Sequence, residues 1–300
     1  MLSRTADNLY WISRYMERAE NLARILRVTD RLSLMPAIAE SDGNEWHSTI
    51  VVAGLEDMFY ERYDEATPES VISFLAFDQE NPSSIRNCIE TARRNGRAVR
   101  TALTTEQWET LNTTWLELPG WNENRVRGSG LNRFLDWVKD RSLLFHGATV
   151  ATMLRRDSYF FSRLGTFIER ADNTARIVDV KYHILLPDEA EVGGGIDYYQ
   201  WASILRAVSG YRSYNSVYRQ GLKPGLIVEF LTLREEMPRS LASCSLGIKE
   251  SLDHLADQYG QRHECHRMAG QIHSRLRFGQ VDDIFRQGLH EFLSEHIENN

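Results

Sequence analysis

The chain has 300 residues, of which 42% are hydrophobic and 26% charged, and its formal net charge at pH 7 is −7. These proportions are typical of a globular protein with a sizeable core, and the acidic balance argues against nucleic acid or an anionic membrane as a partner. We expect neither a membrane span nor a signal peptide, because no apolar run is long enough, and three cysteines without Cys-x-x-Cys spacing indicate a reducing, cytoplasmic location.

The predicted elements are helices along the whole chain. Apolar residues recur with a period near 3.6, and two-residue alternation is scarce. Helices are predicted over residues 4–32, 84–104, 131–147, 153–184, 197–219, 238–258 and 280–297. Turn signals separate them at residues 36–44, 118–130 and 187–195. The sequence therefore predicts an all-α helical bundle.

Two blocks of sequence occur twice, in the same order. YMERAENLARIL (15–26) returns as FIERADNTARIV (167–178), and FLAFDQENPSSIRNC (74–88) returns as FLTLREEMPRSLASC (230–244). Two matching blocks indicate a duplication, so we predict two similar halves, 1–147 and 148–300, related by a pseudo-twofold axis. The helices that carry the Glu-Arg (ER) motifs should lie close together. Whether the halves share one core stays open.

A polar stripe recurs in both copies of the first block. On a helix its members fall within about 60° of one another. They are Glu17, Asn21 and Arg24 in the first copy and Glu169, Asn173 and Arg176 in the second. Acid–arginine pairs four residues apart would merely support a surface helix, yet the same residue types are kept twice. Two interpretations remain: a buried polar seam whose charges satisfy one another, and a ligand site.

A second stripe is arginine-rich and occurs once. If residues 84–103 are helical, four arginines share one face. They are Arg86, Arg93, Arg97 and Arg100. Guanidinium groups bind phosphate or carboxylate in a bidentate manner, so an anion site in the first half is one interpretation. The alternatives are pairing with Glu17 and Glu20, or simple exposure to water.

Other chemistry is sparse. The glycine run at 192–197 lacks the Lys-Ser/Thr of a phosphate-binding loop and predicts a linker. No Glu-x-x-His occurs, which argues against a di-iron centre, and we expect no metal and no cofactor. Zinc could use His263, His266 and His273, but solvated or capping histidines fit better. Adjacent Cys265 and His266 should point about 100° apart, and Cys88 and Cys244 should be core residues.

The combination of motifs resembles a known family. The doubled ERAxNxAR, the MLxR segments at Met1 and Met153, NPSSIRNC followed by ARRNGRAVR, and FHGATVATMLRR are similar to the alpha-E family of bacterial all-helical proteins. The likeness covers nearly the whole chain. It carries over motif residues to Glu17, Arg18, Asn21, Arg24, Glu169, Arg170, Asn173 and Arg176. Thr166 stands where the second motif would carry an arginine.

The resemblance implies a biochemical setting. Such proteins are associated with circularly permuted ATP-grasp ligases, often with transglutaminase-like proteins and proteasome-like peptidases. ATP-grasp ligases activate a carboxylate as an acyl phosphate and transfer it to an amine. The implied function is that of an accessory or substrate-presenting protein for such a ligase, in peptide or amide-bond formation or modification. The alternatives are an enzyme acting on an anionic acyl-phosphate or peptide-carboxylate intermediate, and a non-catalytic helical scaffold.

Overall fold

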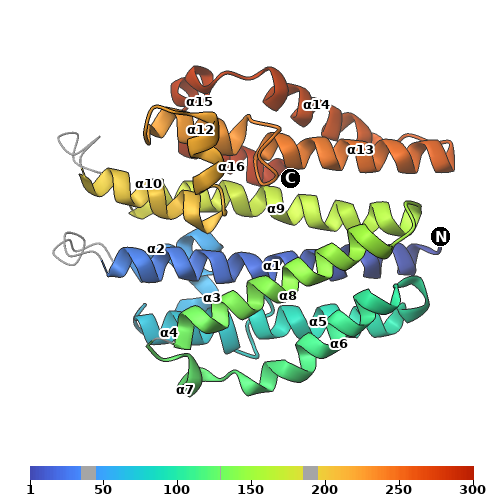
Figure 1. Cartoon of the computed structure of the whole chain (residues 1–300), viewed down its shortest axis with the longest axis horizontal. Coiled ribbons are helices and arrows are strands. Elements are labelled where there is room, and N and C mark those ends of the chain that lie inside the picture. The colour runs from blue at the N-terminus through green and yellow to red at the C-terminus, as the bar shows by residue number, and fades with distance from the viewer. Residues whose placement is uncertain (35–44, 129, 185–194) are drawn as a thin grey trace. The chain divides into compact units, whose positions relative to one another are not determined.

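The computed structural model describes residues 1–34, 45–128, 130–184 and 195–300 (Figure 1). Within these ranges every regular element is a helix, which confirms the all-α class. None of the described helices is both long enough and apolar enough to cross a membrane. The predicted turns at 36–44 and 187–194 lie outside the described residues.

Two compact units make up the chain. The first consists of Met1–Arg24, Ile72–Arg170 and Gly247–Gly270, and the second of Ile25–Val71, Ala171–Leu246 and Gln271–Asn300. The long helices α1 (Ser3–Ser33) and α9 (Asp157–Ile184) each begin in the first unit and end in the second. Each unit contains segments from both halves defined by sequence, and the pseudo-twofold relation of those halves stays a prediction.

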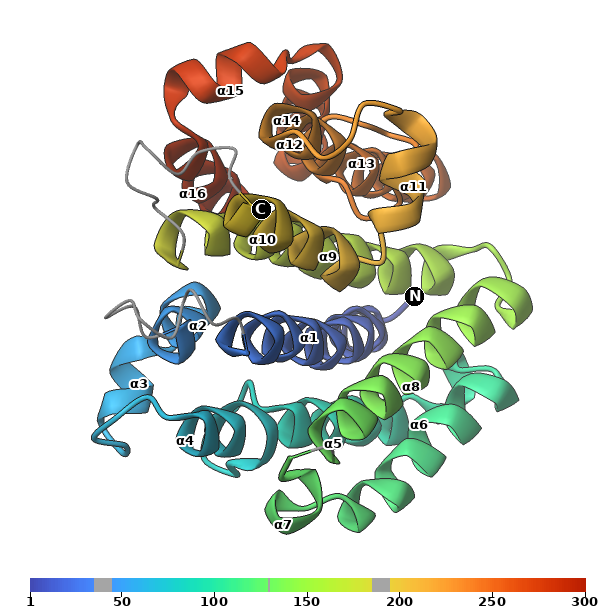
Figure 2. The same ribbon diagram turned by 60° about the vertical axis from the view of Figure 1, so that its left-hand side comes forward.

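In the first unit, α5, α6 and α8 pack beside one another (Figures 1 and 2). Its helices include η1 (Ser73–Phe77, a π-helix), α5 (Ile85–Ala98), η2 (Arg100–Ala102), α6 (Thr105–Glu117), η3 (Leu118–Gly120), α7 (Glu123–Val126) and α8 (Gly130–Thr152). Two further helices, α13 (Leu241–Tyr259) and α14 (Glu264–Phe278), belong partly to this unit and partly to the second. One cluster of buried apolar side chains joins α1, α5, α6 and α8, including Ile12, Met16, Leu111 and Phe145.

The helix predicted over 84–104 is shorter than expected. It ends at Ala98, and Arg100 begins a separate 3₁₀ turn. A capping box explains the break, because Thr104 accepts from the amide of Gln107 while the Gln107 side chain accepts from the amide of Thr104. Local capping therefore starts α6 where the apolar pattern suggested continuation.

The second unit contains shorter helices, in which α10 packs against α11 and α12, α12 packs against α15, and α15 packs against α16. Its further helices are α2 (Glu45–Ala53), α3 (Glu56–Tyr60), α4 (Pro68–Ile72), α10 (Gly195–Ala207), α11 (Tyr211–Val217), α12 (Pro224–Thr232), α15 (Val281–Gln287) and α16 (Leu289–Asn299).

Two helices predicted here as continuous are interrupted. In the 197–219 segment, Ser209 has a left-handed φ of 58° and the amide of Gly210 donates to Leu205. This is a Schellman-type ending of α10. In the 280–297 segment, Gly288 at φ 100° separates α15 from α16. Both breaks depend on a positive φ, which a 3.6-residue period does not reveal.

The second repeated block has the same local structure in both copies. In each copy a serine, Ser84 or Ser240, donates to the carbonyl six residues earlier (2.7 and 2.5 Å) and accepts from the amide three residues later (3.2 and 3.0 Å). Each serine therefore starts the following helix. Cys88 and Cys244 follow in the first turn and are fully buried, as expected of core residues.

Candidate functional site

Helices α1 and α9 approach closely within the first unit. A Cβ atom added to Gly165 would lie 2.1 Å from the backbone oxygen of Tyr10, so only glycine allows this approach. When the two repeated blocks are aligned, Gly165 in the second copy corresponds to Ser13 in the first, so the second copy lacks a side chain at this position. The missing side chain in the second copy brings the two ER segments into contact.

The two ER motifs exchange partners in that contact. Arg170 donates from Nε and Nη2 to the two oxygens of Glu17, at 2.9 and 2.8 Å. Arg18 does the same to Glu169, at 2.6 and 3.0 Å. Arg14 adds a third bond to Glu169 at 2.7 Å. Both glutamates are buried, so these residues form a buried polar network, as in the first of the two interpretations of the stripe.

A second pair continues the network on α1. Arg24 donates to Oε1 of Glu20 from Nε (2.9 Å) and Nη2 (2.5 Å). Ser142 of α8 donates to the other oxygen at 2.7 Å. Glu20 and Arg24 are both buried. The predicted i,i+4 pair therefore forms, but as an interior pair and not as a surface pair.

His146 on α8 joins the network and was not predicted as a site residue. Its Nε2 lies 2.8 Å from Oε2 of Glu17, but the ring is not aligned for a hydrogen bond. Within the described residues, Glu17, Glu20 and His146 form a buried group that could hold a metal ion, with one ligand atom from each within 4.8 Å of the others. A Glu-x-x-His pattern does not reveal this group, because His146 comes from a different helix. The available signal was its place in FHGATVATMLRR.

Asn21 lies one turn after Glu17 on the same helix face. Asn21 is 1% exposed, and among the described residues neither Oδ1 nor Nδ2 has a hydrogen-bond partner. Leaving a buried amide unsatisfied costs roughly 1–3 kcal/mol. Together with the misaligned His146 ring, this amide leaves polar atoms beside the carboxylates that a further group could satisfy.

The glutamate of the network keeps Arg14 and Arg18 in their charged form. Burial acts to lower the pKa of Arg18, but the hydrogen bonds and charge of Glu169 outweigh it, and the pKa is raised. The pKa of Arg14 is raised in the same way. Burial raises the pKa of the Cys88 thiol to about 12, although the charge of Arg18 opposes this. Cys88 is therefore a neutral thiol at physiological pH and not a nucleophile.

The other two residues of the polar stripe in the second copy, Asn173 and Arg176, belong to the second unit. Asn173 is buried there. Arg176 pairs with Asp172 at 2.8 Å and donates to the backbone oxygen of Val52 at 3.0 Å. It thereby satisfies a carbonyl in the last turn of α2, which has no partner within its own helix. The structure thus assigns Arg176 a helix-capping contact.

The arginine stripe has two kinds of member. Arg86 and Arg93 are partly buried, and Arg93 donates to Oδ1 of Asn112 at 3.1 Å and lies over the ring of Trp115. Arg97 and Arg100 are exposed, and Arg100 lies over Trp108. Hence Arg93 is held by α6, and Arg97 and Arg100 are accessible.

His266, near the start of α14, is a capping residue. Nδ1 of His266 accepts from the amide of His263 at 2.9 Å, and Nε2 donates to the carbonyl of Leu252 at 3.1 Å. The ring turns back toward the helix start, so Sγ of Cys265 lies 3.5 Å from Nδ1. The expectation that these adjacent side chains point apart was wrong for this reason. His273 is buried in the second unit, 3.5 Å from Ser245.

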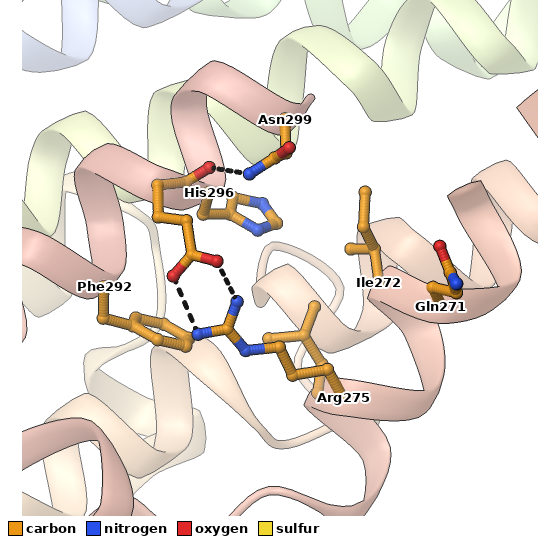
Figure 3. Close-up of a pocket in the computed structure, with 8 residues that line it drawn as sticks. Gln271, Ile272, Arg275, Phe292, His296 and Asn299 are labelled. Carbon is orange, nitrogen blue, oxygen red and sulfur yellow. Dashed lines mark hydrogen bonds and ion pairs between the residues drawn. The ribbon is translucent and has the colours of Figure 1, made fainter. Parts of the chain in front are cut away.

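The second unit also has a small cavity of about 190 Å³ between α14 and α16 (Figure 3). Arg275 and Glu295 form a two-bond ion pair at its edge, at 2.6 and 2.9 Å. Bonds from Arg275 and Gln287 lower the pKa of Glu295 to about 2. Beside them, burial lowers the pKa of His296 to about 4, so this imidazole is neutral at physiological pH.

The fold and the site define an all-helical protein whose two ER motifs are paired with each other through reciprocal Glu–Arg bonds. The chain belongs to the Alpha-E family, described as a predicted alpha-helical domain with a conserved ER motif, and the match covers residues 1–300. No solved structure matches the chain.

Similar proteins occur in mycobacteria. The "Uncharacterized protein Mb2597" of Mycobacterium bovis is 31% identical over 123 residues, which are 36% of this chain and 14% of that protein. The "Uncharacterized protein Rv2567" of Mycobacterium tuberculosis is 30% identical over 123 residues, which are again 36% of this chain and 14% of that protein. The match thus spans about one seventh of each of these relatives.

Proposed function

We propose that the chain is an accessory or substrate-presenting protein for an ATP-grasp-type carboxylate–amine ligase that forms or modifies peptide-like amide bonds. The observation that supports this is that its two sets of arginines differ in pairing and exposure. The ER arginines are occupied by buried glutamates, whereas Arg97 and Arg100 are exposed. The first set holds the fold together, and the second is available to a partner.

The ER network is unsuited to acting directly on a large substrate. Glu17 and Glu169 are buried and each accepts two or more bonds from arginine. A peptide carboxylate would have to displace these carboxylates to reach the guanidinium groups. Displacement would leave a buried charge without its partner, at a cost of about 3–5 kcal/mol. Presentation at the surface avoids this cost.

The exposed arginines are suited to binding an anionic group. A guanidinium stacked on an aromatic ring keeps its N–H edge available while the ring restricts its position. Arg100 over Trp108 has this arrangement, with Arg97 exposed on the preceding turn. Together they form what we call the arginine face, and its ligand would be the carboxylate or acyl phosphate of a substrate carried to the ligase.

The test is binding of the purified full chain to the ATP-grasp ligase encoded nearest to its gene, measured by calorimetry with and without ATP. We expect a complex, and we expect Arg97→Ala/Arg100→Ala to weaken it by about tenfold or more, because charge-assisted hydrogen bonds contribute about 1.5–3 kcal/mol each. Arg94→Ala is the matched control, since Arg94 is exposed on α5 but lies off the stripe.

Two results would contradict the proposal. Absence of a complex under both conditions would favour the alternative that the chain is itself an enzyme acting on the anionic intermediate. An equal effect of Arg94→Ala would show that binding depends on general charge and not on the arginine face.

A further inference from the structure

We infer that Glu17, Glu20 and His146 bind one divalent transition-metal ion inside the first unit, with Asn21 as a fourth ligand. The inference is independent of the proposed partner, because it concerns the buried network and not the arginine face. The three side chains come from α1 and α8 and bring their ligand atoms within 4.8 Å of one another.

The contact between His146 and Glu17 has the geometry of two ligands on one ion. Nε2 and Oε2 are 2.8 Å apart, yet the ring nitrogen is not directed at the oxygen. Ligands that bind one ion at about 2.0–2.2 Å and about 90° stand about 3 Å apart, with each lone pair aimed at the ion. A misaligned contact at this separation is what co-ligation produces.

Asn21 supplies an independent second observation. Residues i, i+3 and i+4 of a helix share one face, and here they are Glu17, Glu20 and Asn21. The Asn21 side chain is almost fully buried and has no hydrogen-bond partner in the part of the chain that the structure describes. An amide oxygen is a metal ligand, so coordination would relieve the cost of burying Oδ1.

The neighbouring residues supply an outer shell. Arg170 and Arg24 bind the two carboxylates, and Ser142 donates to Oε2 of Glu20. Bonds of this kind hold ligating carboxylates in position. The arginines also offset the carboxylate charge, which disfavours Mg²⁺ and Ca²⁺, because their binding relies on accumulated negative oxygen ligands. Imidazole with carboxylate favours Mn²⁺, Fe²⁺ or Zn²⁺.

The experiment measures metal content and affinity on the full chain. Protein purified without chelator is analysed by mass spectrometry for metals, and chelator-stripped protein is titrated with Mn²⁺, anaerobic Fe²⁺ and Zn²⁺. We expect about one ion per chain for at least one of these metals. His146→Gln should weaken binding by about 100-fold or more, and Ser142→Ala by about tenfold, the range for outer-shell groups.

Two further variants keep the outcome decisive. If His146→Gln does not fold, Asn21→Asp serves instead and should tighten binding, since it replaces a neutral ligand by a charged one at equal length. His266→Gln is the matched control for adventitious zinc, because His266 contacts an exposed cysteine on α14. It should leave the stoichiometry unchanged.

Failure to bind any of the three ions at one per chain would overturn the inference and leave the network holding at most water. Binding that disappears in His266→Gln and persists in His146→Gln would overturn it too, by moving the ion to α14. An unchanged or weakened affinity in Asn21→Asp would remove Asn21 from the ligand set and contradict the site as stated.

Discussion

Glu17 accepts two hydrogen bonds from Arg170, and Glu169 accepts two from Arg18, so each ER motif binds the arginine of the other. The reciprocal contact explains why the motif occurs twice in one chain. A glutamate in one copy needs an arginine in the other, and neither can change alone without leaving a buried charge. Such a contact has the pattern of an isologous pair.

Replacing Glu17 by Gln should lower the free energy of unfolding by about 3 kcal/mol, because Arg170, which is largely buried with its side chain 13% exposed, would lose its counter-charge. Urea unfolding followed by circular dichroism measures this. Glu90→Gln, an exposed position on α5, is the control and should change stability by less than about 0.5 kcal/mol. Adding Arg170→Met to Glu17→Gln should recover part of the loss; a double variant with the summed losses would mean that the pair is not coupled.

Gly165→Ala should be among the more damaging small substitutions. The new methyl group would lie 2.1 Å from the Tyr10 oxygen, so α9 would have to move away from α1. Overpacking of this kind costs about 1–3 kcal/mol. Gly147→Ala on α8 is the matched control, because its Cβ would meet nothing within 4 Å, and it should gain about 0.5–1 kcal/mol. Thermal unfolding of both variants measures the difference. Equal unfolding midpoints for the two variants would contradict the close approach of α9 to α1.

Much of this architecture could be predicted from the sequence. The 3.6-residue period predicted α1 and α9 to within a few residues. The duplicated block singled out the ER segments, but it left a buried seam and a ligand site as alternatives. The period could not show where Gly288 or Ser209 would break a helix, because those breaks depend on backbone φ. Nor could it show Arg100 leaving α5, which follows from the Thr104 cap.

The site was predictable only in part. Spacing on one helix placed Glu17 and Asn21 on a common face, but it carries no information about a ligand from another helix. His146 therefore entered only with the structure, although it lies in a motif that resembled the family. The arginine stripe was placed correctly as a helix face, yet burial divided it into a held member, Arg93, and an exposed member, Arg97.

That division predicts unequal effects on stability. Arg93→Ala should cost about 1–2 kcal/mol, because it removes the bond to Asn112 and the contact with Trp115. Arg97→Ala should stay within about 0.5 kcal/mol of the parent chain. Urea midpoints measured side by side test this. A larger loss for Arg97 than for Arg93 would mean that Arg97 is a structural residue and would weaken its role in the arginine face.

The three cysteines should differ in reactivity. Cys265 is exposed, whereas Cys88 and Cys244 are fully buried, and burial raises the pKa of Cys88 to about 12. Since the thiolate is the reactive form, a native chain treated with a thiol reagent at pH 8 should show one fast-reacting group, and a urea-unfolded chain three. Cys265→Ser should abolish the fast phase. A fast phase that persists in this variant would place a second thiol within reach of solvent.

The pH dependence of stability should carry the signature of His296, which lines the cavity in Figure 3. Burial is the main cause that lowers its pKa from 6.5 to about 4; the charge of Arg275 lowers it further, and those of Asp172 and Glu295 oppose the shift. Between these two pH values the unfolded chain binds a proton that the folded chain does not. The contribution of His296 to the free energy of unfolding is therefore fully present above pH 6.5. It falls by on the order of 3 kcal/mol as the pH drops toward 4.

Glu295 adds a second loss at lower pH, because its pKa is lowered to about 2 and its contribution disappears only below about pH 4.5. The two windows can thus be separated by measuring urea unfolding at pH 7, 5.5 and 4.5. His296→Gln keeps a neutral polar side chain, so its stability should vary less than that of the parent chain over this range. If the variant and the parent lose stability in parallel between pH 7 and 4.5, His296 is not buried as a neutral imidazole, and the acid sensitivity arises from other groups.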